Sequence, residues 1–137
     1  MGRTNVVAAE ATAEIDVRIK NAKQAIMLDR RLRSLKPFDN HCRLNLEGGI
    51  NRMPMERNSG VAALYHKAVA VAEQMDWKLE EAAVGGGSDG NFTAGLGVPT
   101  LDGLGGVGSG AHAAHEHVVI AELPRRALLL AGLIESV

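Results

Sequence analysis

Apolar and polar residues alternate one by one in two stretches near the start of the chain, residues 12–19 and residues 42–47. Such alternation predicts β-strands that each bury one face. Between these stretches, apolar residues recur at helical spacing from residue 22 to residue 35. Asn21 can cap this helix, and Pro37 interrupts its pattern. The first part of the chain is therefore predicted to be strand, helix, strand.

Beyond the glycine pair Gly48-Gly49, helical and strand patterns continue to alternate. Helices are predicted to begin at Asn58 or Ser59, at Ser88, and close to Pro124. The first of these helices has an inner face of six apolar residues: Val61, Leu64, Ala68, Val71, Ala72 and Met75. Strands are predicted over residues 78–84 and 98–101. The order of elements predicts an α/β fold in two pieces, residues 1–48 and residues 49–137.

Composition narrows the classes of function that fit. The 137 residues carry 15 basic and 16 acidic side chains, so the net charge of −1 offers no footprint for nucleic acid or an anionic membrane. The basic run from Arg30 to Arg33 is expected to cover an exposed helix face. The single cysteine, Cys42, fits a reducing compartment and is expected to be a buried filler of its strand. Without a membrane-spanning stretch or a signal peptide pattern, we expect a soluble, cytoplasmic protein.

Two glycine-rich segments are the strongest candidates for chemistry. Gly85, Gly86 and Gly87 precede Ser88 at a predicted helix start, where backbone N–H groups can face an anion. A tight turn without a ligand is the alternative, and a Walker-type loop is excluded because no lysine follows. The second segment, residues 103–108, has the spacing of a dinucleotide fingerprint, but neither the amphipathic helix nor the acidic residue of that fingerprint follows it.

Histidines and arginines supply further candidates. His112, His115 and His117 surround Glu116, but their spacing matches no zinc peptidase helix motif, so a single imidazole joined by ligands from elsewhere is preferred. Arg18 ends a predicted strand and Arg52 follows the glycine pair. A fixed guanidinium suits bidentate capture of a carboxylate, and a solvated surface arginine is the alternative for each.

The run from Val84 to Ala94, followed by Gly110-Ala111-His112-Ala113, resembles the carboxyl-terminal part of the dinuclear zinc peptidases and amidohydrolases. This family includes glutamate carboxypeptidase, aminoacylase and succinyl-diaminopimelate desuccinylase. Asn5-Val6-Val7-Ala8 and Asp16-Val17-Arg18 resemble its lid, or dimerisation, domain, although alanine stands at residue 8 where proline is usual. The resemblance implies half of a ferredoxin-like lid, residues 1–48, followed by the carboxyl-terminal half of the catalytic α/β domain, residues 49–137.

The resemblance also implies roles for individual residues. The substrate-binding residues would be Asn5, Arg18, Arg52, Gly86, Gly87 and Ser88. His112 would be the last zinc ligand of a site that holds two zinc ions in the complete family. Arg52 would hold the terminal carboxylate of an N-acyl amino acid or peptide, and two zinc ions would activate the water that attacks the neighbouring amide.

The other family ligands have no counterpart in this sequence. No His-x-Asp pair occurs, and Glu80-Glu81 lies on a predicted strand where it is expected to be solvated. We therefore expect a chain that is inactive alone and needs a missing N-terminal half or a partner chain. A non-catalytic carboxylate-binding or regulatory module and a gene remnant are the alternatives. Open strand edges at 12–19 and 42–47 further predict a homo-oligomer.

Overall fold

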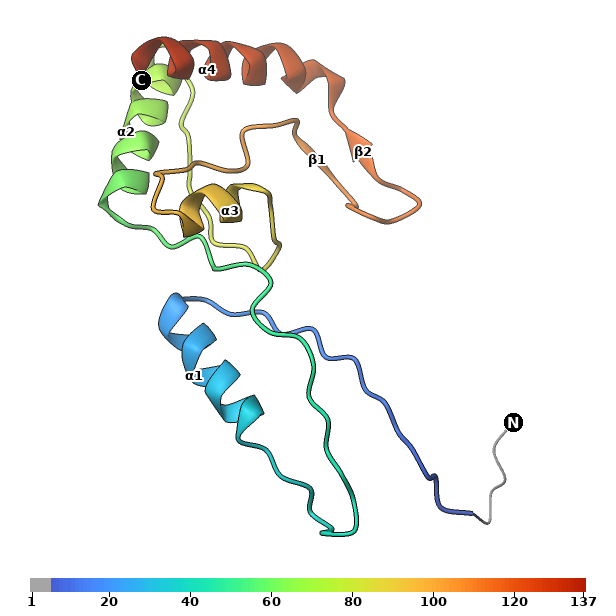
Figure 1. Cartoon of the computed structure of the whole chain (residues 1–137). Helices are drawn as coiled ribbons and strands as arrows, with labels where there is room; N and C mark the ends of the chain where they lie inside the picture. The colour runs from blue at the N-terminus through green and yellow to red at the C-terminus, as the bar shows by residue number, and fades with distance from the viewer. Residues whose placement is uncertain (1–5) are drawn as a thin grey trace.

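The computed structural model describes residues 6–137. Four α-helices, a short 3₁₀ helix and one two-stranded sheet form its regular structure: α1 (Ala22–Arg33), α2 (Ser59–Glu73), α3 (Gly90–Gly95), β1 (Gly108–Ser109), β2 (His117–Val118), η1 (Ile120–Glu122) and α4 (Leu123–Ser136). In Figure 1, α1 lies beside two long extended segments, and the other elements gather at the opposite end of the molecule. None of the helices within these residues combines the length and apolar character that a membrane span requires.

The starts of α1, α2 and α4 confirm the predictions made for them, whereas α3 begins at Gly90 and not at Ser88. Asn21 accepts a hydrogen bond from the backbone N–H of Gln24 at 2.8 Å and caps α1. Asn58 does the same for α2, accepting from Val61 N–H at 3.0 Å. Pro124 occupies the first turn of α4, where its missing N–H leaves no hydrogen bond unmade. These contacts lie within four residues, so local sequence suffices to specify them.

The main packing contact joins α2 and α4, and its buried side chains are small or aliphatic. Ala68 and Ala72 of α2 and Leu129 and Leu133 of α4 are buried, which confirms the inner face predicted for α2. Gly132 lets the helices approach closely, since a Cβ there would lie 2.7 Å from a methyl carbon of Val71.

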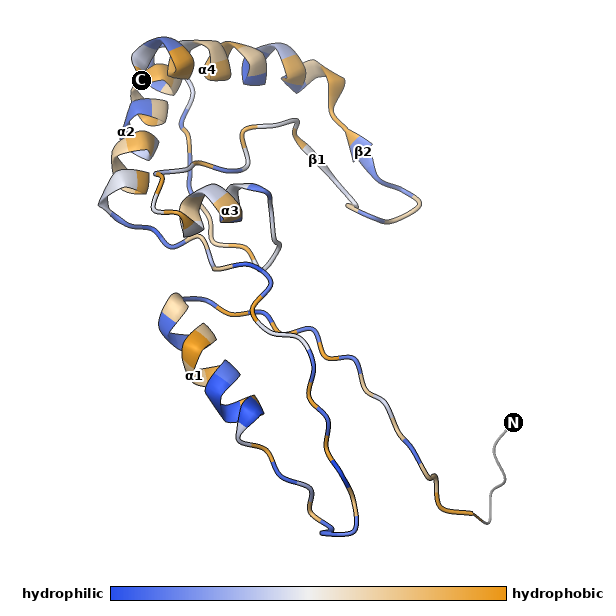
Figure 2. Ribbon diagram, in the orientation of Figure 1, coloured by the Kyte–Doolittle hydropathy of each residue, from blue (hydrophilic) through white to orange (hydrophobic). Residues whose placement is uncertain are grey.

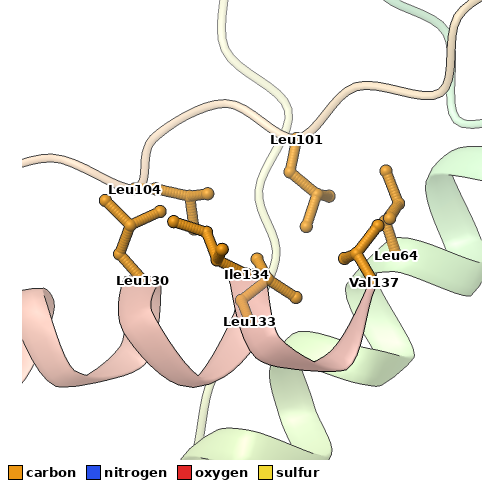
Figure 3. A pocket seen from close by; sticks show the side chains of 7 residues that line it. All are labelled: Leu64, Leu101, Leu104, Leu130, Leu133, Ile134 and Val137. Atoms are coloured by element: carbon orange, nitrogen blue, oxygen red, sulfur yellow. The ribbon is translucent and has the colours of Figure 1, made fainter.

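An apolar depression of about 440 Å³ lies beside this helix pair (Figure 3). Its walls are leucine, isoleucine and valine side chains from α2, α4 and the segment that joins α3 to β1: Leu64, Leu101, Leu104, Leu130, Leu133, Ile134 and Val137. No titratable group lines it, so it offers packing surface and no means of polar recognition.

The strands predicted over 12–19, 42–47, 78–84 and 98–101 are not paired into a sheet within residues 6–137. A strand is defined by hydrogen bonds to a neighbour, and no segment in the described part of the chain lies in register beside them. Figure 2 shows the alternation persisting along the extended segments that flank α1. The α/β fold and the division at residue 48 therefore stay predictions.

The burial expected for these stretches is wrong in this structure. Ile15 and Val17, predicted to face a core, are 66% and 44% exposed. Cys42, predicted to be a buried filler, is exposed with a free thiol. The physical reason is the same in each case: an apolar strand face is buried only when a helix or second sheet covers it. The basic residues Arg30 to Arg33 do lie on exposed turns of α1, as predicted.

Candidate substrate-binding loop

The segment from Gly85 to Ser88 joins an extended stretch to α3 and remains open to solvent along its glycines. A Cβ added at Gly86 would meet no atom within 4 Å, so the loop keeps free space above its centre. Ser88 has its side chain occupied locally, because its Oγ accepts a hydrogen bond from the N–H of Gly90 at 3.0 Å. Asp89, not Ser88, is the N-cap residue of α3, and its side chain makes no capping bond.

Arg18 reaches this loop from 67 residues away in the sequence. Its Nη1 donates to the carbonyl oxygen of Gly85 at 2.9 Å, and its Nε lies 3.4 Å from a carboxylate oxygen of Asp16. The Arg18 side chain is 67% exposed, so its remaining N–H donors face solvent. Arg18, a candidate binding residue in the sequence, therefore lies at the first residue of the glycine loop.

Arg52 lies at the other end of the same loop. Its Nη1 is 3.6 Å from a carboxylate oxygen of Asp89 and 3.9 Å from the position that a Cβ of Gly87 would take. The guanidinium carbon lies 4.6 Å above the centre of the Phe92 ring, within the range of a cation–π contact. The structure therefore brings Arg18, Arg52 and the glycine loop together, while their roles in substrate binding stay predictions.

Three residues of this arrangement were missed by sequence reasoning: Asp89, Asn91 and Phe92. Asn91 donates from Nδ2 to the carbonyl oxygen of Met53 at 2.8 Å and accepts at Oδ1 from the N–H of Ser88 at 2.8 Å. The only signal in the sequence was their position directly after the glycines. That position gave no indication that residues near 52 would lie beside them.

The histidine cluster occupies a different part of the fold. His112 lies in the turn between β1 and β2, which stands apart from α3 and the loop before it in Figure 1. Its backbone is in the left-handed region with φ of 66°, and its N–H donates to the Glu116 carboxylate at 3.2 Å. The structure therefore does not bring His112 to the glycine loop. Asn5, the remaining predicted substrate-binding residue, lies outside the described residues.

A zinc ion requires three or four protein ligands in tetrahedral arrangement. Among residues 6–137, no group of three or more histidine, cysteine, aspartate or glutamate side chains is gathered in that way. His117 directs its Nδ1 toward the carbonyl oxygen of His115 at 3.1 Å, and both residues are exposed. The described residues therefore do not fit a complete zinc site.

The remaining acidic pair and the second glycine segment have structural roles. Glu81 pairs with Arg57 at 2.8 Å, and Glu80 pairs with Lys78, whose hydrogen bond lowers the pKa of Glu80. Both pairs are solvated, as predicted for Glu80-Glu81. Residues 103–108 run into β1 instead of a helix, and Arg126 donates to the carbonyl oxygens of Gly103 and Gly105, so the dinucleotide fingerprint is not met.

The exposed glycine loop thus has the guanidinium of Arg18 at its first residue and that of Arg52 near its last glycine. The family model of peptidase family M20/M25/M40 matches residues 6–136. The chain therefore belongs to this peptidase family, whose members are typically metal-dependent hydrolases. No curated protein sequence and no solved structure matches the chain.

Proposed function

We propose that this chain forms the substrate-binding part of a zinc-dependent metallopeptidase or amidohydrolase of the carboxypeptidase type. The bond cleaved would be an amide or peptide bond next to a free carboxylate. The observation that carries the proposal is the meeting of Arg18 and Arg52 at one open glycine loop, in a chain that belongs to a peptidase family. Neither arginine is required there to pair a buried charge, because both ion pairs involve exposed carboxylates.

The chemistry of the loop suits a substrate that ends in a carboxylate. A guanidinium presents two parallel N–H donors to the two oxygens of a carboxylate, and such charge-assisted bonds are stronger than neutral ones. Arg52 is 36% exposed, so part of its guanidinium is reachable from solvent and part is fixed by protein contacts. Gly86 and Gly87 add no side chain above the loop, which leaves room for the substrate backbone.

His112 is proposed as this chain's contribution to the metal site, with the other ligands coming from elsewhere in the polypeptide or from a partner chain. Zinc, when bound, would activate a water molecule for attack on the amide carbonyl. The residues described here would bind and orient the carboxylate end of the substrate. A homo-oligomeric or two-chain assembly is part of this proposal, because an inactive binding half needs a second component.

A non-catalytic carboxylate-binding module is the second candidate. The specific observation in its favour is that residues 6–137 gather the two arginines but no cluster of metal ligands. In that case the pocket would bind N-acyl amino acids without turning them over. Both candidate functions include the same carboxylate site. They differ only in whether a metal-binding half completes the site and makes it catalytic.

Binding of N-acetylglutamate and of its α-carboxamide to the full chain, measured by NMR titration, tests the shared proposal. We expect the carboxylate to bind more tightly than the carboxamide. Arg52→Ala should weaken carboxylate binding, because losing a charge-assisted pair costs about 1.5–3 kcal/mol, or about 10- to 150-fold. The partial exposure of Arg52 places the expected loss near tenfold.

The matched control is Arg31→Ala, which removes an exposed arginine from α1 and leaves the loop intact. It should bind both ligands like the unmodified chain. Equal weakening of carboxylate and carboxamide by Arg52→Ala would remove Arg52 from the site. Zinc-dependent hydrolysis after addition of a family member's metal-binding half would favour the enzyme over the binding module.

A further inference from the structure

The Arg52 guanidinium is held by contacts from the residues that follow the glycine loop. The Phe92 ring lies beneath it at 4.6 Å, and the Asp89 carboxylate lies beside it at 3.6 Å. Both contacts come from the start of α3, so this helix and Arg52 are placed by the same group of residues. A long, flexible side chain that is already fixed loses less conformational entropy when it binds.

We infer that Asn91 and Phe92 are positioning residues for Arg52, acting on substrate only through that arginine. The inference rests on the proposed role of Arg52 in carboxylate binding. Neither residue was identified from the sequence, and each acts through a different kind of contact. Asn91 fixes the backbone that carries Arg52, and Phe92 fixes the guanidinium itself.

Asn91 connects two segments that are distant in the sequence. Its Nδ2 donates to the carbonyl oxygen of Met53, the residue after Arg52, across 38 positions. Its Oδ1 accepts from the N–H of Ser88, the residue after the glycines. An amide is the side chain that can donate in one direction and accept in the other. Aspartate would keep the bond to Ser88 N–H but would place a carboxylate against the Met53 carbonyl oxygen.

Phe92 makes its contribution at the surface. The residue is 50% exposed, and its ring lies 4.6 Å from the guanidinium carbon of Arg52. A cation–π contact at an exposed site is worth about 0.5–1 kcal/mol, which corresponds to about two- to fivefold in an equilibrium constant. The ring therefore covers part of the guanidinium, while Nη1 lies 3.6 Å from a carboxylate oxygen of Asp89.

The Arg52 Nε–H resonance of the full chain provides a direct test. A proton above an aromatic face is shifted upfield by the ring current, and Phe92→Leu should remove that shift. Phe92→Tyr keeps a ring at the same place and should retain it. Phe38→Leu is the matched control, since Phe38 is the other phenylalanine in the sequence and is fully exposed. The Nε–H of Arg57, paired with Glu81, serves as an internal reference that should not move.

Asn91→Asp should weaken the same upfield shift, because the segment containing Arg52 and Met53 would no longer be held by a hydrogen bond from residue 91. Asn45→Asp is its control, since Asn45 is exposed and its Nδ2 donates to Glu47, two residues further along the chain. In titrations with N-acetylglutamate, Phe92→Leu should reduce affinity two- to fivefold, and Phe92→Tyr should restore it. The carboxamide should show no such difference.

The outcomes separate the two claims. If the Arg52 Nε–H resonance is not shifted upfield, or if Phe92→Leu does not change it, the positioning role is overturned, whether or not the chain binds N-acetylglutamate. A ring-current shift that responds to both variants, in a chain that binds no carboxylate, supports the positioning of Arg52 and overturns the proposed function. Loss of affinity for carboxylate and carboxamide alike overturns the claim that these residues act through Arg52.

Discussion

Replacing Gly132 by alanine should have two opposing effects on the free energy of unfolding: a gain in helix propensity and a cost from crowding at the contact between α2 and α4. The residue lies within α4 and faces Val71 of α2 across the main packing contact. A Cβ at position 132 would lie 2.7 Å from Cγ1 of Val71, closer than carbon atoms approach in folded proteins. Gly132→Ala therefore forces either a side-chain rearrangement at Val71 or a separation of the two helices.

The sizes of these two effects decide whether Gly132→Ala raises or lowers the free energy of unfolding. Replacing glycine by alanine inside a helix stabilises it by about 0.8–1 kcal/mol through backbone entropy. Inserting a methyl group into a packed contact costs about 1–3 kcal/mol. We therefore expect Gly132→Ala to lower the free energy of unfolding by up to about 2 kcal/mol. Val71→Ala removes the methyl carbon Cγ1 that would crowd the site, so Val71→Ala in the Gly132→Ala background should recover most of the loss.

Urea unfolding followed by far-UV circular dichroism measures all four members of this double-mutant cycle. Fluorescence of Trp77, the only tryptophan, gives a second signal, because Arg125 of α4 lies 4.2 Å above its ring. Coupling between the two positions should favour the double variant by about 1–2 kcal/mol. If Gly132→Ala stabilises the chain by about 1 kcal/mol and shows no coupling to Val71, α2 and α4 do not pack as described.

Three further outcomes are expected. Leu129→Ala should destabilise the chain by about 2–5 kcal/mol in the same urea assay, because Leu129 is fully buried between α2 and α4; a change below 1 kcal/mol would mean that this core is not formed. The chain alone should not hydrolyse N-acyl amino acids with added zinc, since its described residues gather no three metal ligands; turnover with contaminating enzyme excluded would contradict this. Light scattering at micromolar concentration should show a dimer or larger species, because residues 12–19 and 42–47 expose apolar side chains and unpaired backbone groups; a cooperatively melting monomer would refute it.

The sequence by itself determined where α1, α2 and α4 begin, but it placed the start of α3 at Ser88 instead of Gly90. Asn21, Asn58 and Pro124 act on backbone groups within one turn, so their effect does not depend on the rest of the fold. The inner face of α2 could equally be predicted from the sequence, because helical periodicity places its apolar residues on one side before any partner is known. The family resemblance similarly made Arg18 and Arg52 candidates for substrate binding from local motifs.

Tertiary structure decided everything that depends on a distant partner. The alternating stretch at 12–19 specifies which residues share a face, but a paired strand also needs a neighbour, and a buried face needs a covering layer. The meeting of Arg18 with Gly85 spans 67 residues, and that of Asn91 with Met53 spans 38. No local pattern encodes such contacts, because they depend on how the chain closes its loops. The arginines could therefore be proposed from the sequence, whereas the residues that hold Arg52 in place became visible only in three dimensions.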